Sequence, residues 1–269
     1  MLPTPRWFYC LLLLVPGSAW AQSNLEKAIG VQSMQVSAGT YEIRASNRWR
    51  GPMQVQVRLT PESSNVSTTI ALPQRWELGG SQTKGLFRIS PVDPTRPGNF
   101  GLVVEAVPGG TGVSHQTNYP YRWPLMNDIG RMDQGFGGTH SHSDAENFYA
   151  IDIAAPPGSP IIASRPGTVM AVEDGFSRGG LDPALMSQAN FVRILHDDGS
   201  MASYVHIAHR SARVVAGQSV VAGQHLGALG GVGYASGPHL HFVVQINAGM
   251  KLESVKFKMF QPRTAASGL

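Results

Sequence analysis

The stretch Ser236-Gly237-Pro238-His239-Leu240-His241-Phe242 is the most informative part of this chain. Side chains two positions apart on a β-strand share a face, so a strand over this stretch places His239 and His241 side by side. The apolar residues from Phe242 to Ile246 favour such a strand. Two adjacent imidazoles suit a metal ion, or a metal ion with a general base. The alternative is a pair of polar histidines on an exposed face, and the rest of the chain decides between the two.

The first residues have the character of a secretory signal peptide. Arg6 supplies a positive charge, Trp7 to Val15 form a short apolar run, and Ala19-Trp20-Ala21 is a small-x-small cleavage site. We therefore expect a signal peptide over 1–21 and a mature chain that begins at Gln22. The apolar run is too short to span a bilayer as a helix, which disfavours an uncleaved anchor. These features predict a periplasmic or extracellular protein with no stable membrane anchor after cleavage.

Cysteine usage and net charge narrow the chemistry further. The single cysteine, Cys10, lies inside the predicted signal peptide, so the mature chain has no disulfide and no thiol nucleophile. A metal site must then use His, Asp or Glu. The formal net charge of +4 falls by one, to +3, when Arg6 leaves with the signal peptide. A mild positive charge without runs of Lys or Arg suits an anionic envelope and does not indicate nucleic-acid binding.

The composition and the strand pattern predict an all-β protein. Gly, Pro, Val and Thr are abundant and charges are few, which favours strands and turns. Met53–Leu59 alternates apolar and polar residues, as a half-buried strand does, and turn clusters separate it from similar runs up to Val107. The predicted organisation is a signal peptide (1–21), an antiparallel β-sandwich-like domain (22–112), a linker (113–129), a second β-rich domain (130–250) and a C-terminal tail (251–269).

The second domain is expected to contain short strands and almost no regular helix. Its expected strands cover Tyr149–Ala154, Ile161–Ser164, Gly167–Glu173, Asn190–His196, Ser200–His206 and His239–Ile246. At most a turn or two of helix is expected at Leu181–Gln188.

Residues that can bind metal or transfer protons gather in this second domain. They occur in Thr139–Asp144, Tyr149–Ile153 and Tyr204–His209, as well as in the His-Leu-His stretch. Asp152 stands in an apolar run, where an ionised carboxylate is costly unless a cation or strong donors pair with it. A metal ion is the simplest partner, and the alternative is an Asp that caps a turn before Pro156. His206 taken alone fits a core histidine bonded to a carbonyl equally well.

The motifs around these residues occur in a characteristic order. They are Asp152 in an apolar strand, Gly158–Ala163, Gly167-Thr168-Val169, Asn190–Gly199, Tyr204-Val205-His206, Val220–Gln224 and Gly237–Phe242. This ordered set resembles the lysostaphin/LytM-type zinc metallopeptidases, which cut peptidoglycan peptides, over about residues 130–246. The His-x-His motif alone is unspecific, whereas the whole set is specific. The resemblance implies a β-rich LytM-type metallopeptidase domain with an open antiparallel sheet.

The resemblance also implies a zinc site. The family binds one zinc ion through a His, an Asp and the second His of His-x-His, which correspond here to an upstream His, Asp152 and His241. The commonest family pattern, His-x-Gly-x-Asp, has its first histidine where this chain has Phe148. A loop variant of the family has a Ser-His pair ahead of a Tyr-Ala-x-Asp strand, and Ser141-His142 resembles it. We therefore assign His142 as the first ligand, with His140 in reserve.

By the same resemblance, His206 and His239 are the catalytic histidines. Three protein ligands leave one zinc position open for water, as in catalytic sites. His239 can take a proton from that water as general base. His206 can stabilise the oxyanion or hydrogen-bond the water, and the sequence leaves open which histidine has which role.

Two functions of different classes follow from these residues. The first is a secreted Zn²⁺-dependent endopeptidase that hydrolyses peptide cross-links of bacterial peptidoglycan, with the peptide stems as substrate and an envelope protein as an additional expected partner. The second is a metal-free, wall-binding scaffold that activates a partner cell-wall hydrolase, for which Phe148 is the hint of a lost ligand. A structural β-sandwich adhesin with incidental histidines fits the ordered motifs less well.

Overall fold

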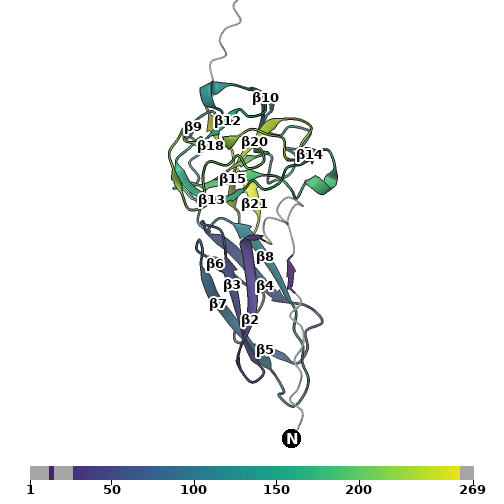
Figure 1. The fold of residues 1–269 in the computed structure, drawn as a ribbon. Coiled ribbons are helices and arrows are strands. Elements are labelled where there is room, and N and C mark those ends of the chain that lie inside the picture. Colours follow the sequence, from purple (N-terminus) through teal and green to yellow (C-terminus); the bar gives the residue numbers. More distant parts are fainter. Residues whose placement is uncertain (1–11, 15–26, 261–269) are drawn as a thin grey trace, which may run out of the picture. The chain divides into compact units, whose positions relative to one another are not determined.

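The computed structural model describes residues 12–14 and 27–260 (Figure 1). Most of the predicted signal peptide and the last residues of the predicted tail, from 261 on, lie outside these described residues. The chain divides into two compact units, one of Met1–Arg48 with Pro52–Val107 and one of Trp49–Gly51 with Pro108–Leu269. Strands dominate both units, which confirms the predicted all-β class. Over the described residues, none of the helices has the length and apolar character needed to cross a membrane.

The first unit contains two four-stranded sheets. One has the order β2 (Ile29–Ser37), β3 (Thr40–Asn47), β7 (Thr83–Pro91), β5 (Val66–Thr68), and the other has the order β1 (Leu12–Leu14), β8 (Leu102–Pro108), β4 (Met53–Leu59), β6 (Gln74–Leu78). The pairs β2–β3, β3–β7, β5–β7 and β4–β6 are antiparallel, and β1 pairs with β8 in parallel. Alternate side chains such as Ile43, Val55 and Val104 are buried, so each sheet has one apolar face.

The second unit is built on an eight-stranded antiparallel sheet. Its order is β10 (Arg131–Gln134), β11 (Ile151–Ala154), β20 (His239–Asn247), β16 (Met201–Val205), β15 (Phe191–Leu195), β13 (Gly167–Glu173), β17 (Ser219–Val220), with β21 (Leu252–Ser254) paired to β20. Three strand pairs complete it: β12 (Pro160–Ile162) with β18 (His225–Ala228), β14 (Gly179–Gly180) with β19 (Gly233–Tyr234), and β9 (Pro120–Tyr121) with β22 (Lys258–Met259). The expected open antiparallel sheet is therefore present.

Among its described residues, the second unit contains helix only as single turns. The 3-10 helices are η1 (Met126–Asp128) and η2 (Pro183–Leu185). Asp182 caps η2, because its carboxylate accepts a hydrogen bond of 3.0 Å from the backbone N–H of Ala184. This turn lies inside the Leu181–Gln188 stretch for which a turn or two of helix was expected.

The segments predicted as a linker (113–129) and a tail (251–269) differ from that expectation. Tyr121, Trp123 and Leu125 are buried in the core of the second unit, and Phe257 joins them from the other end of the chain. From Pro120 to Trp123, exposed and buried residues alternate. The prolines in this segment interrupt the sequence pattern, so the sequence does not indicate that Tyr121 and Trp123 pack against a sheet formed by distant residues. Both segments therefore belong to the packed domain as far as residue 260.

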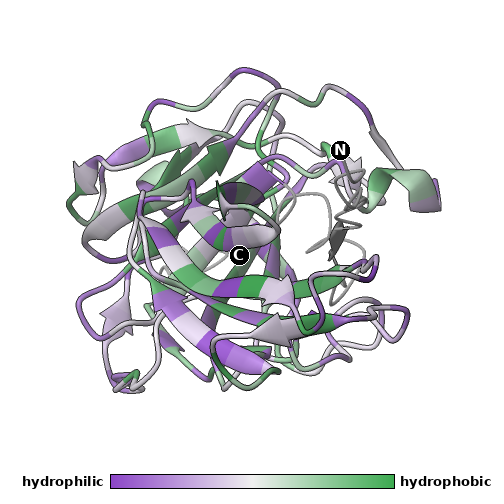
Figure 2. Ribbon diagram, turned by 90° about the horizontal axis from the view of Figure 1, so that it is seen from below, coloured by the Kyte–Doolittle hydropathy of each residue, from purple (hydrophilic) through white to green (hydrophobic). Residues whose placement is uncertain are grey.

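The apolar and polar residues of the strands are arranged to give the sheet two different faces. Hydrophobic and hydrophilic bands alternate along several strands in Figure 2. On β20, Leu240, Phe242 and Val244 belong to the buried core, while His239 and His241 alternate with them and are only partly buried. One face of this strand thus packs against the core, and the other carries the histidines.

Candidate metal centre

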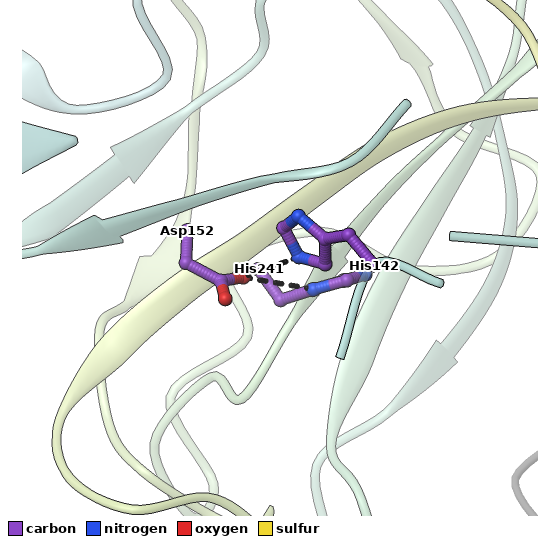
Figure 3. Close-up of side chains that lie close together, drawn as sticks. All are labelled: His142, Asp152 and His241. Carbon is purple, nitrogen blue, oxygen red and sulfur yellow. Dashed lines mark hydrogen bonds and ion pairs between the residues drawn. The ribbon is translucent and has the colours of Figure 1, made fainter. Parts of the chain in front are cut away.

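Two of the predicted ligands come from paired strands. Asp152 of β11 lies directly opposite His241 of β20, and residues opposite each other in an antiparallel pair share a face. The Nδ1 atom of His241 is 2.9 Å from Oδ1 of Asp152. Figure 3 shows these two side chains pointing toward one another. The strand register alone therefore brings an imidazole and a carboxylate into contact.

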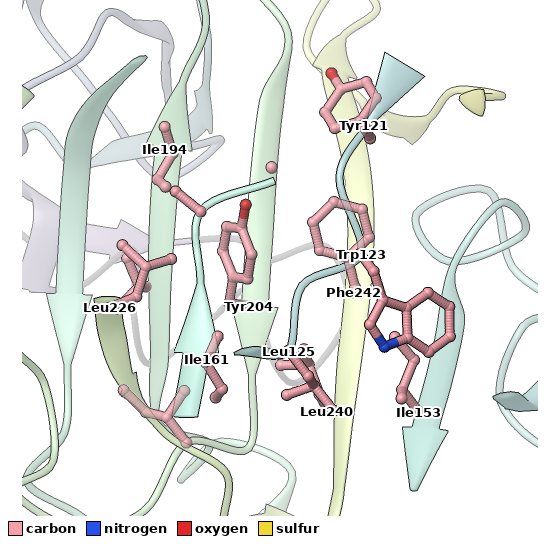
Figure 4. Close-up of a cluster of buried hydrophobic side chains, with 14 of the residues drawn as sticks. Tyr121, Trp123, Leu125, Ile153, Ile161, Ile194, Tyr204, Leu226, Leu240 and Phe242 are labelled. Carbon is pink, nitrogen blue, oxygen red and sulfur yellow. The ribbon is translucent and has the colours of Figure 1, made fainter. Parts of the chain in front are cut away.

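The core behind these strands holds that register. Ile153 and Leu240 form the next pair along the same two strands, and their side chains are fully buried on the opposite face. Figure 4 shows both with Phe242 in the apolar cluster. A slip of one residue would move Asp152 into this cluster and the apolar side chains out of it, which is strongly unfavourable.

The third predicted ligand comes from a loop. His142 lies between β10 and β11 and is completely buried. Its Nδ1 donates a hydrogen bond of 2.9 Å to the carbonyl of Gly135, and its Nε2 points to Asp152, 3.3 Å from Oδ1. This Nε2 has no hydrogen-bond partner among the described residues. A buried, unpartnered ring nitrogen facing a carboxylate is a position that a metal ion would satisfy.

The two predicted catalytic histidines lie beside this group. His239 places Nε2 3.8 Å from Oδ1 of Asp152, and its Nδ1 donates to the carbonyl of Gly237 over 2.9 Å. His206 donates from Nδ1 to the carbonyl of Val232 over 2.8 Å. The ring centroids of His206 and His239 are 4.6 Å apart. In their neutral forms both rings therefore present an Nε2 lone pair.

The backbone at His206 departs from the predicted strand. The strand expected over Ser200–His206 ends at Val205, which lies opposite His241 and shares its face. In an extended strand the next side chain, His206, would point to the other face. His206 instead has φ 68°, an uncommon left-handed conformation for a residue with a side chain. This local turn brings its ring beside His239.

The charges in the site strongly influence one another. Burial raises the pKa of Asp152, but the adjacent imidazoles of His142 and His241 outweigh this effect and hold that pKa far below its ordinary value. Burial lowers the pKa of His142, yet the adjacent Asp152 raises it above its ordinary value overall. Burial, together with the nearby His239, lowers the pKa of His206 to about 3. Asp152 is therefore an anion and His206 a neutral base near neutral pH.

The donor set fits a metal ion. One ligand atom each from His142, Asp152 and His241 lies within 4.8 Å of the other two, and this is the one such group among the described residues. Two neutral imidazoles and one carboxylate form the kind of three-ligand set that catalytic zinc sites use. Together with the unpartnered Nε2 of His142, this arrangement could hold a divalent cation.

The remaining histidines lie apart from this group. His140 is exposed and is not a member of it. His209 is exposed and donates to the carbonyl of Phe176. His196 is not at the surface, although Asp197, which follows it, is exposed. The ring of His196 is buried, bonded to the carbonyl of Pro166 and packed against Tyr121 at 5.6 Å.

Two amide side chains that the sequence did not indicate touch the ligands. Gln134 donates from Nε2 to Oδ2 of Asp152 over 3.0 Å. The Oδ1 atom of Asn147 lies 3.2 Å from Nε2 of His241. No motif or spacing marks either residue, because both act through contacts with residues distant in the sequence.

The fold and the site together define a class of protein. A His–Asp–His group beside two further histidines, on an antiparallel sheet, has the composition of a metallopeptidase centre. Residues 146–252 match the model of peptidase family M23, so this part of the chain is a family M23 peptidase domain. The matched range contains Asp152, His206, His239 and His241, whereas His142 lies before it.

Parts of this chain are similar to several known proteins. Cell division protein DipM of Caulobacter vibrioides is 29% identical over 149 residues, which cover 55% of this chain and 22% of that protein. Peptidoglycan DD-endopeptidase ShyC of Vibrio cholerae is 33% identical over 129 residues, which cover 47% of this chain and 27% of that protein. The catalytic domain of lysostaphin from Staphylococcus simulans is 28% identical, with 44% of this chain and 82% of that domain covered and a TM-score of 0.34. The chain thus spans well under half the length of the two curated relatives.

Proposed function

We propose that this protein is a secreted zinc-dependent endopeptidase that hydrolyses peptide cross-links of bacterial peptidoglycan. One observation carries the proposal. Nitrogen atoms of His241, His142 and His239 converge on a single carboxylate oxygen of Asp152, at 2.9, 3.3 and 3.8 Å. Three of these four side chains suffice to hold a metal ion, and the fourth, His239, remains for proton transfer.

The substrate and the location are supported by less direct observations. A relative named as a peptidoglycan endopeptidase supports peptide stems of the cell wall as substrate. The signal-like sequence over 1–21 supports export to the periplasm or the exterior. An envelope protein that recruits the enzyme to the wall is part of the same proposal.

The chain's own residues supply the proton chemistry. When bound, zinc would polarise the scissile carbonyl and lower the pKa of a water molecule. His206 and His239 each donate from Nδ1 to a backbone carbonyl, so their Nε2 atoms accept hydrogen bonds. A water molecule in front of both rings has two hydrogens for these two acceptors. We assign proton abstraction to His239, which is the nearer neighbour of Asp152, and orientation of the water to His206.

The scaffold alternative depended on Phe148. Phe148 is about half exposed and packs edge-on against Tyr149, with ring centroids 5.0 Å apart. In the commonest family pattern, the first histidine ligand stands where this chain has Phe148. Here the loop histidine His142 lies beside Asp152 instead. The Phe148 side chain therefore does not leave the group short of a third ligand.

Metal analysis and wall digestion on the same samples test this function. The purified mature protein is expected to hold about one zinc ion per chain and to release new amino groups from purified sacculi. A variant without residues 22–112 controls for a substrate groove covered by the first domain. If the zinc-loaded protein and this variant both released none, the peptidase proposal would fail and the activating scaffold would replace it.

A further inference from the structure

We infer that Gln134 and Asn147 are positioning residues that decide which atom Asp152 and His241 each present to the metal ion. The inference rests on the proposed metal centre and concerns the hydrogen bonds around it. In metal sites of proteins, such outer hydrogen bonds orient the ligands and fix their tautomers.

Both ring nitrogens of His241 face oxygen atoms. Nδ1 is 2.9 Å from Oδ1 of Asp152, and Nε2 is 3.2 Å from Oδ1 of Asn147. A neutral imidazole carries one proton, so it can donate to only one of these two oxygens. The ring of His241 must therefore donate its proton to one of Asp152 and Asn147 and direct the lone pair of its other nitrogen toward the second residue.

Asp144 orients the amide of Asn147. The Nδ2 atom of Asn147 donates to both carboxylate oxygens of Asp144, at 3.0 and 3.1 Å, and its backbone N–H donates to Oδ1 of Asp144 over 2.9 Å. The amide nitrogen is thereby occupied, and the amide oxygen must face His241. An oxygen there accepts the proton of His241 Nε2, which leaves Nδ1 as the lone pair beside Asp152.

Gln134 acts in the same way on Asp152. Its Nε2 donates to Oδ2 of Asp152 over 3.0 Å and to the hydroxyl of Ser141 over 2.8 Å, and its Oε1 accepts from the backbone N–H of His140 over 3.1 Å. All its hydrogen-bonding atoms thus point in defined directions. Oδ2 of Asp152 is occupied by Gln134, and Oδ1 is the oxygen on which the histidines converge.

The chain leaves room for Gln134 in this position. A Cβ atom added to Gly138 would lie 2.2 Å from Cγ of Gln134, so any other residue at 138 would displace that side chain. Gln134 also links β10 to the loop that carries His142, through Ser141 and His140. One amide therefore contacts both the strand ligand Asp152 and the loop that carries His142.

Nuclear magnetic resonance can read the inferred tautomer directly. In zinc-loaded, ¹⁵N-labelled protein, long-range ¹H–¹⁵N spectra are expected to show His241 protonated at Nε2 and without a proton at Nδ1. His142 is expected to show the opposite pattern, because its Nδ1 donates to the carbonyl of Gly135. A proton on Nδ1 of His241 in the zinc-loaded protein would overturn the inference.

Zinc affinity, measured by competition with a chelating dye, tests each residue. Asn147→Leu and Gln134→Met remove the hydrogen bonds and are each expected to weaken zinc binding roughly 10–100-fold. The exchange Asp144→Asn with Asn147→Asp reverses donor and acceptor between these two residues but keeps an acceptor oxygen for His241 at position 147, so it is expected to retain most of the affinity. Asp133→Asn is the matched control, because Asp133 neighbours Gln134 and bonds to Arg131.

The outcomes separate this inference from the proposed function. Unchanged affinity in Asn147→Leu and Gln134→Met, with wild-type protein binding zinc, would overturn only the inference. Equal losses of zinc affinity in Asn147→Leu and in the exchanged variant would also overturn the inference, because an acceptor oxygen at position 147 would then not support zinc binding. Wild-type protein that binds no zinc would overturn both. Thermal unfolding of the metal-free variants shows whether a loss comes from misfolding, and in that case the tautomer spectrum of the wild type decides.

Discussion

The strands β11 and β20 and the loop between β10 and β11 contribute to the same site by different physical means. Asp152 and His241 are placed by strand register, which the apolar face behind them enforces. His142 has no such register and depends on individual hydrogen bonds, from its backbone N–H to Gly138 over 3.1 Å and from its ring to Gly135. Strand ligands should therefore keep their positions in the metal-free protein better than the loop ligand.

The largest expected effect comes from the strand side of this comparison. Asp152→Ala removes the one anionic ligand and should abolish tight zinc binding, a greater loss than the roughly 10–100-fold caused by outer hydrogen bonds. Metal content after dialysis and dye competition measure it, with Asp133→Asn as control. Stoichiometric zinc retained by Asp152→Ala would contradict the assignment of this carboxylate.

The loop side is tested by its two histidines. His142→Ala should lose both zinc and activity, because it removes a ligand nitrogen that nothing else in the loop replaces. His140→Ala should keep most of both, since His140 is exposed and outside the ligand group. Metal content and release of amino groups from sacculi are the measurements. The opposite result would place the loop ligand two residues earlier in the chain.

The next effect separates ligands from proton-transfer groups on the same strand. His239→Ala should retain zinc and lose turnover about 10²–10⁴-fold, as expected for a general base. His206→Ala should also retain zinc, with a loss of about 10²–10³-fold if its ring stabilises the reacting oxygens. Zinc content and turnover are measured on the same samples. Loss of zinc in His239→Ala would show that His239 is itself a zinc ligand and that His142, Asp152 and His241 do not suffice to hold the ion.

The smallest expected effect is on stability and comes from His196, which is buried directly after β15 and lies outside the metal group. Burial lowers the pKa of His196 to about 4, below the ordinary value of 6.5. The unfolded chain therefore binds more protons between these values, so the free energy of unfolding should fall as the pH falls from 6.5 toward 4. His196→Asn keeps a donor for the carbonyl of Pro166 without titrating, and should remove about 1–3 kcal/mol of this dependence.

Denaturant unfolding of the metal-free protein at several pH values measures this dependence. Zinc is left out so that the ligands contribute equally to wild type and variant. An identical pH dependence in wild type and His196→Asn would show that the buried ring does not contribute.

Local sequence patterns alone predicted the strand part of the site. The alternation of His239 and His241 with Leu240 places both histidines on one face, because the period of a strand is two residues. The apolar residues on both sides of Asp152 indicated a strand with a polar side chain that needs a partner. Gly167–Glu173 is a strand over the residues that its pattern predicts. These features depend only on residues that are neighbours in the sequence, so a local pattern is enough to predict them.

Contacts between distant residues decided the rest. The pairing of Asp152 with His241, the turn that brings His206 to His239, and the presence of His142 instead of His140 all depend on which strands and loops pack together. The same holds for Gln134 and Asn147, whose hydrogen bonds reach ligands that no spacing rule connects to them. The local sequence pattern predicts a linker at Tyr121 and a tail at Phe257 for this reason. Burial is a property of the folded sheet, and a local pattern interrupted by prolines does not display it.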